Sequence, residues 1–118
     1  MRKQITAAAI REYAEHTGDL APIHLQDEAA RQAGYPAPIA HGMYLMGLAQ
    51  SIYLAEHRTH WIQSSSMKFQ RPLVQDTLAC FVYEANNDSI LVTITEQNED
   101  GAVIAKGDFI VKKGVCSV

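Results

Sequence analysis

Cysteine is scarce in this sequence, which contains only Cys80 and Cys116. These two residues form no CxxC pair and have no companion cysteines, so neither a zinc cage nor a disulfide framework is indicated. An excess of cations is also absent, since ten lysines and arginines stand against thirteen aspartates and glutamates and the formal net charge is -3. A broad basic surface for phosphate backbones is therefore lacking, and we expect no nucleic-acid partner.

Long apolar runs are missing as well. The longest apolar-rich stretch, from Met43 to Ala55, is interrupted by Gln50 and Ser51 and is too short to span a bilayer. The N-terminal residues carry charges where a signal peptide needs an unbroken apolar stretch. We therefore expect a cytoplasmic protein with reduced thiols and no membrane partner. With 118 residues, no linker and no internal repeat, the chain is expected to form a single domain over residues 1–118.

Helical signals dominate the first half of the chain. Thr6 is a favourable N-cap, and apolar residues recur at helical spacing over residues 7–16 until Gly18 supplies a stop. A short helix is expected over residues 27–32. The longest expected helix covers residues 40–57 and is apolar on nearly every face, which is typical of a helix buried on all sides.

Strand signals dominate the second half. Four segments of strand character follow the long helix, and a short strand is expected at residues 3–5. The polar clusters between the four segments are expected to form hairpin turns at Arg71-Pro72, at residues 86–88 and at residues 98–101. The pattern predicts an α+β fold in which an antiparallel sheet is wrapped around one long buried helix. The four segments are residues 61–70, 77–85, 89–97 and 102–112.

The residues most suited to catalysis lie between positions 17 and 43. Asp19 and His24 are close in sequence within a loop punctuated by Gly and Pro, and a carboxylate and an imidazole held together can share the protons of a water molecule. His41 and Gly42 directly precede the apolar part of the long helix, where the Gly42 N–H can bind an anion or a carbonyl oxygen. Together these residues indicate a hydration or dehydration site.

Three motifs in the chain resemble those of one protein family. They are Gly18-Asp19-x-x-Pro22-Ile23-His24, Ile39-Ala40-His41-Gly42-Met43 and Met67-Lys68-Phe69-x-Arg71-Pro72-Leu73. In these motifs the chain is similar to the MaoC-like, or (R)-specific enoyl-CoA hydratase, branch of the hot-dog fold. The resemblance runs through nearly the whole chain. It implies a hot-dog domain and a homodimer, or a dimer-based oligomer, that joins two sheets edge to edge.

The resemblance also implies a reaction and a role for individual residues. Members of the family hydrate trans-2-enoyl thioesters to (R)-3-hydroxyacyl thioesters, or run the reverse, on acyl-CoA or acyl carrier protein substrates. By position, Asp19 and His24 would be the catalytic pair, and the Gly42 N–H would form the oxyanion hole for the thioester carbonyl. This chemistry needs neither a metal nor a redox cofactor, so none is expected. Substrate contacts are expected from His41, Tyr44 and Gln50.

Two positions depart from the family pattern. The family usually carries Asn before the motif proline, as GDxNPxH, and this chain has Ala21, whose side chain cannot make the hydrogen bonds of an amide. A serine that is common on the central helix is replaced by Gln50, with Ser51 beside it. Neither change removes Asp19 or His24.

Two other functions compete with the hydratase reading. A hot-dog thioesterase normally needs a carboxylate on or beside the central helix, but Glu56 comes only at its end. A non-catalytic acyl-CoA-binding protein would be consistent with Ala21, although a decayed site is expected to lose Asp19 or His24.

His57 and His60 form an HxxH pair without a third ligand nearby, which favours a solvated helix end over a metal site.

A partner chain is also expected from the sheet itself. Exposed strand edges are normally protected, and we expect the second subunit to cover an edge formed by the strand that contains Cys80.

Overall fold

A computed structural model describes residues 1–97 and 101–114 of the chain. The expected turn at residues 98–100 and Cys116 lie outside the described residues. The helices are α1 (Ala7–Thr17), α2 (Pro22–Leu25), α3 (Asp27–Gln32) and α4 (Gly42–Glu56). The strands are β1 (Arg2–Ile5), β2 (His60–Phe69), β3 (Thr77–Asn86), β4 (Ser89–Glu96) and β5 (Val103–Lys113).

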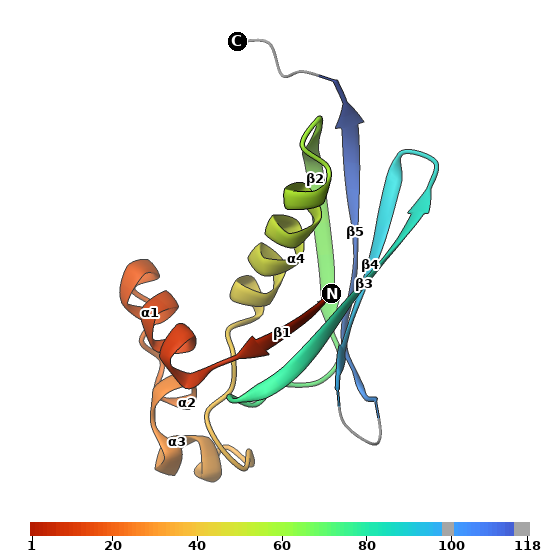
Figure 1. Cartoon of the computed structure of the whole chain (residues 1–118). Coiled ribbons are helices and arrows are strands. Elements are labelled where there is room, and N and C mark those ends of the chain that lie inside the picture. The colour runs from red at the N-terminus through yellow and green to blue at the C-terminus, as the bar shows by residue number, and fades with distance from the viewer. Residues whose placement is uncertain (98–100, 115–118) are drawn as a thin grey trace.

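The strands form one antiparallel sheet in the order β1-β3-β4-β5-β2. Figure 1 shows α4 lying along one side of this sheet, while α1, α2 and α3 gather near the start of α4. The α+β hot-dog architecture expected from the sequence is therefore confirmed. None of the described helices is long and apolar enough to cross a membrane.

The sheet order corrects one predicted hairpin. Arg71-Pro72 does not join paired strands, because β2 pairs with β5 and β3 pairs with β1 and β4. The backbone N–H groups of Gln70 and Arg71 donate to the Ile104 carbonyl. The chain then runs from the edge strand β2 to β3, in the opposite half of the same sheet. The turn between β3 and β4 does form a hairpin, with Asn87 at a positive φ of 57°.

The strand that contains Cys80 is not a sheet edge, so that expectation was wrong. Cys80 lies in β3, and β1 pairs with β3 on the side away from β4, with Arg2 opposite Cys80. The short strand expected at residues 3–5 forms as β1 and covers this edge of β3. The two edges of the sheet are β1 and β2.

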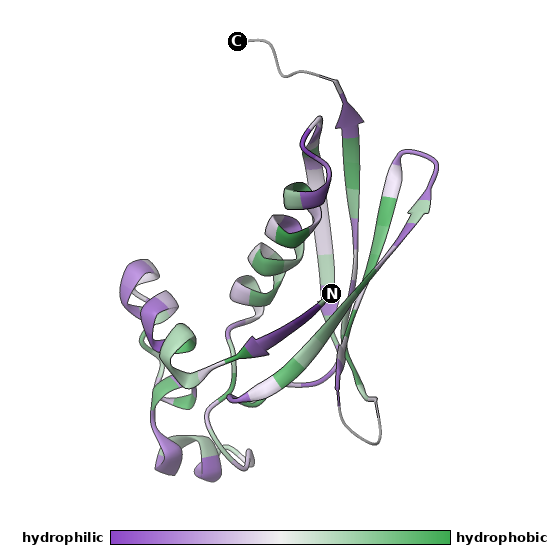
Figure 2. Ribbon diagram, viewed as in Figure 1, coloured by the Kyte–Doolittle hydropathy of each residue, from purple (hydrophilic) through white to green (hydrophobic). Residues whose placement is uncertain are grey.

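Helix α4 is buried on one face rather than on all sides. Leu45, Ala49 and Tyr53 recur every fourth residue and are nearly inaccessible, whereas Met43 is 64% exposed. The prediction of burial all round fails because the sheet of this chain covers only one side of a helix that is apolar on most faces (Figure 2). The hydroxyl of Tyr83 donates to the Ala49 carbonyl at 2.6 Å and holds α4 against β3.

Local signals explain the first two helices. The Thr6 hydroxyl oxygen accepts from the Ala9 N–H at 3.0 Å and caps α1, and Gly18 ends α1 at a φ of 78°. Helix α2 was expected to be loop. It forms because Pro22 stands at the first helical position, where its missing N–H costs nothing.

Candidate active site

Asp19 follows directly on the end of α1. Its backbone N–H lies 3.4 Å from the Thr17 hydroxyl, and its carboxylate oxygen Oδ1 accepts from the Ala21 N–H at 3.4 Å. This local turn directs the chain from α1 into α2. The Asp19 side chain is 56% exposed, so its carboxylate can exchange protons with water.

His24 is held by α2 and by a carbonyl fifteen residues further along the chain. Its Nδ1 lies 2.7 Å from the Ile39 carbonyl oxygen, which can only accept, so Nδ1 carries the proton and donates it. In the neutral ring, Nε2 is then left with a free lone pair. His24 is half-buried and is oriented to take a proton at Nε2.

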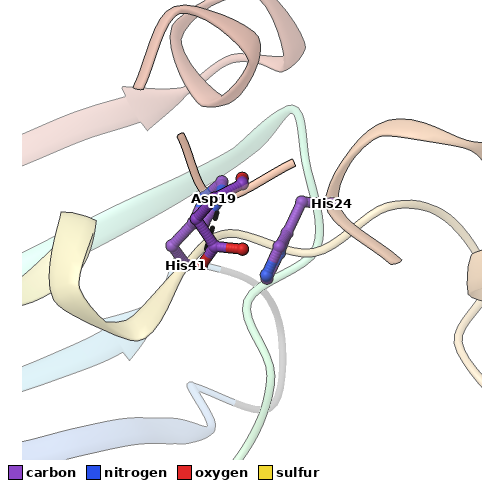
Figure 3. Close-up of side chains that lie close together, drawn as sticks. All are labelled: Asp19, His24 and His41. Atoms are coloured by element: carbon purple, nitrogen blue, oxygen red, sulfur yellow. Dashed lines mark hydrogen bonds and ion pairs between the residues drawn. The ribbon is translucent and has the colours of Figure 1, made fainter. Parts of the chain in front are cut away.

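His41 and Gly42 are placed by the segment that leads into α4. The Ala40 N–H donates to the Leu73 carbonyl at 2.8 Å, which fixes this segment against the loop after β2. His41 is 3% exposed, and its Nε2 lies 3.0 Å from the Asp19 carbonyl oxygen. Figure 3 shows Asp19, His24 and His41 gathered in one cluster.

The backbone N–H of Gly42 is available to a ligand. Gly42 is the first residue of α4, so its N–H has no partner within the helix. An N–H at this end also benefits from the positive end of the helix dipole. A Cβ at position 42 would lie 3.0 Å from a ring carbon of Phe69, so glycine leaves space between α4 and that ring.

A pocket of about 390 Å³ opens beside these groups. His24 and Gly42 both line it, and within the described part of the chain neither Nε2 of His24 nor the Gly42 N–H has a hydrogen-bond partner. The walls are otherwise largely apolar, and Gln70 and Arg71 add polar groups. Its further lining residues are Tyr35, Ile39, Ala40, Leu45, Phe69, Pro72 and Leu73.

The residues expected to contact substrate lie elsewhere in this chain. Tyr44 packs against Tyr13 of α1 with ring centroids 5.2 Å apart, and burial, followed by the nearby Glu12 carboxylate, raises the pKa of Tyr44. Gln50 donates to the Ser65 hydroxyl at 2.9 Å and ties α4 to β2. Neither these residues nor His41 line the pocket. Their contact with substrate stays a prediction.

Sequence reasoning passed over most of the pocket walls. Phe69 and Arg71 belong to the third motif, but the motif alone does not show that this loop faces Gly42. Tyr35 follows the positive φ of Gly34, and its N–H donates to the Ala30 carbonyl at 2.9 Å. The glycine that ends α3 was the one sequence signal that could have directed attention to Tyr35 as a residue beside the site.

The three clustered side chains invite a test as a metal site. Ligand atoms of Asp19, His24 and His41 lie within 4.8 Å of one another. The two imidazole rings, however, are stacked with centroids 3.7 Å apart and planes inclined by only 22°. An ion about 2.1 Å from both nitrogens would need to lie near both ring planes, and nearly parallel planes do not meet so close to the rings. This arrangement does not suit a shared metal ion.

Comparison with known proteins agrees with the motifs. A 3-hydroxybutyryl-CoA dehydratase of Methylorubrum extorquens is 36% identical over 52 residues, which are 44% of this chain and 33% of that protein. A 3-hydroxyacyl-thioester dehydratase X of Mycobacterium tuberculosis is 37% identical over 84 residues, 70% of this chain and 29% of that protein. The chain thus matches about a third of the length of these curated relatives.

A solved structure supports the fold. The (R)-hydratase from A. caviae involved in PHA biosynthesis superposes with a TM-score of 0.77 at 22% identity, covering 96% of this chain and 91% of that one. The family model described as a MaoC-like domain matches residues 1–103. That match covers the α1–α2 turn, the start of α4 and the pocket, and the chain belongs to the MaoC-like domain family.

Proposed function

We propose that this chain catalyses the reversible hydration of trans-2-enoyl thioesters to (R)-3-hydroxyacyl thioesters. The observation that carries the proposal is one pocket lined by both His24 and Gly42, with a carboxylate oxygen of Asp19 within 4.8 Å of a ring nitrogen of His24. Asp19 itself does not line this pocket. The names of the relatives support the same class of reaction.

The proposed mechanism adds one water molecule across the carbon–carbon double bond. Asp19 and His24 bind the water, its oxygen forms a bond to the β-carbon, and one proton is delivered to the α-carbon. Negative charge develops on the thioester oxygen during this step, and the Gly42 N–H donates to it. Loss of one such donor costs roughly 3 kcal/mol in other enzymes, so Gly42 would account for a large share of the rate.

Thioester hydrolysis remains the competing chemistry. Glu56 is the only carboxylate within α4, and it lies at the end of the helix opposite to Gly42. It lines a different pocket, together with Tyr53 and His57. Glu56 therefore does not line the pocket of His24, where a thioesterase would need a nucleophilic or basic carboxylate. Its position favours hydration over thioester hydrolysis.

The substrate carrier and the assembly are part of the proposal. An acyl group bound as a thioester to CoA or to acyl carrier protein would place its carbonyl at Gly42. We propose a homodimer or a dimer-based oligomer as the active form, because both a sheet edge and the outer face of α4 lie open in the single chain.

Absorbance of crotonyl-CoA tests the reaction directly. Hydration removes the conjugated enoyl thioester and lowers its ultraviolet absorbance without releasing thiol, whereas a thioesterase releases free CoA. Asp19→Asn and His24→Ala should each lower turnover strongly, and the double variant should be little worse than either one, because the two residues act as a unit. Independent, multiplying losses, or a wild-type rate in either variant, would remove the pair from the mechanism.

A further inference from the structure

Three aromatic rings contact one another in a row beside the pocket. Tyr13 of α1 meets His41 at a tilt of 50° with centroids 4.8 Å apart, and His41 is stacked on His24 with centroids 3.7 Å apart. The middle ring, His41, is 3% exposed, whereas His24 is half-buried and Asp19 is exposed. The buried ring of His41 therefore contacts the ring of His24, which lines the pocket.

His41 also makes the shortest hydrogen bond to Asp19 among the described residues. Its Nε2 lies 3.0 Å from the Asp19 carbonyl oxygen, while the bonds of Asp19 to Thr17 and Ala21 are both 3.4 Å long. The same nitrogen is 4.0 Å from the Asp19 carboxylate oxygen Oδ2. One imidazole thus touches both members of the proposed pair, Asp19 through an N–H and His24 through its ring face.

The other ring nitrogen of His41, Nδ1, is left without a hydrogen bond to any described residue by this arrangement. A carbonyl oxygen can only accept, so Nε2 carries the proton and the neutral ring has a bare lone pair at Nδ1. Nδ1 is buried and has no hydrogen-bond partner in the described part of the chain. A phenylalanine would remove this orphaned nitrogen but would lose the N–H, and a glutamine would keep an N–H but would lose the ring. Of these three side chains, only histidine offers both contacts.

We propose that His41 is a positioning residue that holds Asp19 and His24 in the relative orientation needed to activate water, acting as a neutral imidazole protonated at Nε2. Its effect on catalysis rests on the proposed hydratase function. His41 does not line the pocket, so it acts through the other two residues and not on substrate. This proposed role is an alternative to the substrate contact expected from the sequence.

The protonated nitrogen can be observed without any substrate. Long-range ¹H–¹⁵N correlation spectra at neutral pH should place the proton of His41 on Nε2 and that of His24 on Nδ1, with the signals assigned from His41→Gln and His24→Ala. A proton on Nδ1 of His41 would overturn the proposal, since the bond to Asp19 would then be absent. This result stands whether or not the chain hydrates enoyl thioesters.

Kinetics test the positioning role. His41→Phe keeps a ring on His24 and loses the N–H, and we expect kcat for crotonyl-CoA to fall by roughly 10- to 100-fold while KM changes by less than about 2-fold, because misplacement of about 1 Å can cost 10²-fold. His41→Gln restores a donor and should recover part of kcat. If His41→Phe does not fold, His41→Gln and the spectra still decide the question. Unchanged kcat in both variants would overturn the proposal.

The Asp19→Asn background separates positioning from general destabilisation. A residue that acts only through the pair should cause little further loss when one member is already disabled, so His41→Phe should lower the residual rate of Asp19→Asn by less than about 2-fold. An equal loss in both backgrounds would mean that His41 acts independently, and would overturn the proposal. A wild-type chain with no activity would instead refute the proposed function and leave the spectra to decide on His41.

Discussion

At the scale of single residues, Ala21 stands at a position where the family pattern has an amide side chain that can form hydrogen bonds. It is the N-cap of α2, the helix that carries His24, and it makes no side-chain capping bond. Asn, Asp, Ser and Thr normally fill this position, and their replacement by Ala costs about 0.5–2 kcal/mol. The Asn of the family pattern can therefore be understood as a cap of the helix that carries His24.

Ala21→Asn should stabilise the chain by about 0.5–2 kcal/mol and raise kcat/KM for crotonyl-CoA, because a capped α2 holds His24 more firmly. Ala21→Ser is the matched variant, since it adds a capping oxygen with less bulk. Thermal unfolding and crotonyl-CoA kinetics measure both effects. If Ser raises kcat/KM and Asn lowers it for a bulky enoyl-CoA, the pocket has adapted to a small side chain. If neither variant raises it, the idea of a loosened loop is wrong.

The sequence could predict which residues lie near one another but not how their protons are arranged. Asp19 lies close to His24, and His24 and Gly42 line one pocket, while the catalytic roles of the three residues stay a prediction. The tautomer of His24 depends on the Ile39 carbonyl, and that of His41 depends on the Asp19 carbonyl. These backbone groups are set by long-range packing, which no local pattern encodes.

At the scale of elements, Gly42 at the start of α4 lies close to Phe69 at the end of β2. A Cβ at position 42 would approach Phe69 ring carbons to 3.0 and 3.1 Å, whereas a Cβ at Gly47, in the same helix, would meet nothing within 4 Å. Phe69 is 45% exposed, so its ring can move, but it also lines the pocket. An added methyl group is therefore expected to disturb the pocket at Gly42 and to be tolerated at Gly47.

Gly42→Ala should lower kcat/KM by roughly 10-fold, because the new methyl group displaces Phe69 in the pocket while the N–H is kept. Gly47→Ala should leave activity unchanged and stabilise α4 by up to about 1 kcal/mol, as expected for Gly to Ala in an exposed helix interior. Crotonyl-CoA kinetics and thermal unfolding of both variants test the pair. Equal activity in Gly42→Ala and the wild type would show that the contact does not shape the pocket.

The HxxH pair joins the end of α4 to the start of β2 rather than being free in solvent. His57 stacks on Tyr53 at 4.1 Å and donates from Nδ1 to its carbonyl, and the Tyr53 hydroxyl lies 2.7 Å from Nδ1 of His60. Desolvation, followed by the charges of His57 and Lys113, lowers the pKa of His60. The folded state therefore favours the neutral form of His60 over its protonated form.

Stability should fall as the pH drops below about 6.5, the usual pKa of histidine, because the unfolded chain then binds a proton that folded His60 resists. His60→Asn keeps an acceptor for the Tyr53 hydroxyl and cannot titrate, so its midpoint of unfolding should fall less between pH 7.5 and 5.5. His16→Asn changes an exposed histidine and is the control. A drop as steep in His60→Asn as in the wild type would contradict this account.

Elements formed by local signals were predictable, as was the hairpin of β3 and β4, but the pairing of strands distant in sequence was not. The bounds of α1, α3 and the four long strands were anticipated to within one or two residues, because caps, periodicity and turn residues are local. Arg71-Pro72 has the composition of a turn, but which strands it joins depends on β2 pairing with β5 far along the chain. The pairing of β1 with β3 likewise joins residues that are more than seventy positions apart in the sequence.

At the scale of the whole molecule, this chain leaves apolar surface open around β2 and α4. Strand β2 is a sheet edge, and Trp61 within it is 41% exposed. Met43 on the outer face of α4 is 64% exposed. Unpaired strand edges and a helix apolar on most faces are both normally covered, which is what a second copy of the chain would do.

We expect the protein to be a dimer of the 13.0 kDa chain by light scattering at micromolar concentration, with β2 at the interface. Trp61 is the only tryptophan, so dilution through the dissociation constant should shift its fluorescence toward that of an exposed indole. Trp61→Asp should weaken dimerisation by at least about 10-fold, since aromatic anchors at interfaces are often worth 2 kcal/mol or more. Val82→Asp changes a residue that is 55% exposed on the interior strand β3, and it should leave the mass unchanged. A monomeric wild type would contradict the dimer, and dissociation by Val82→Asp but not by Trp61→Asp would move the interface away from β2.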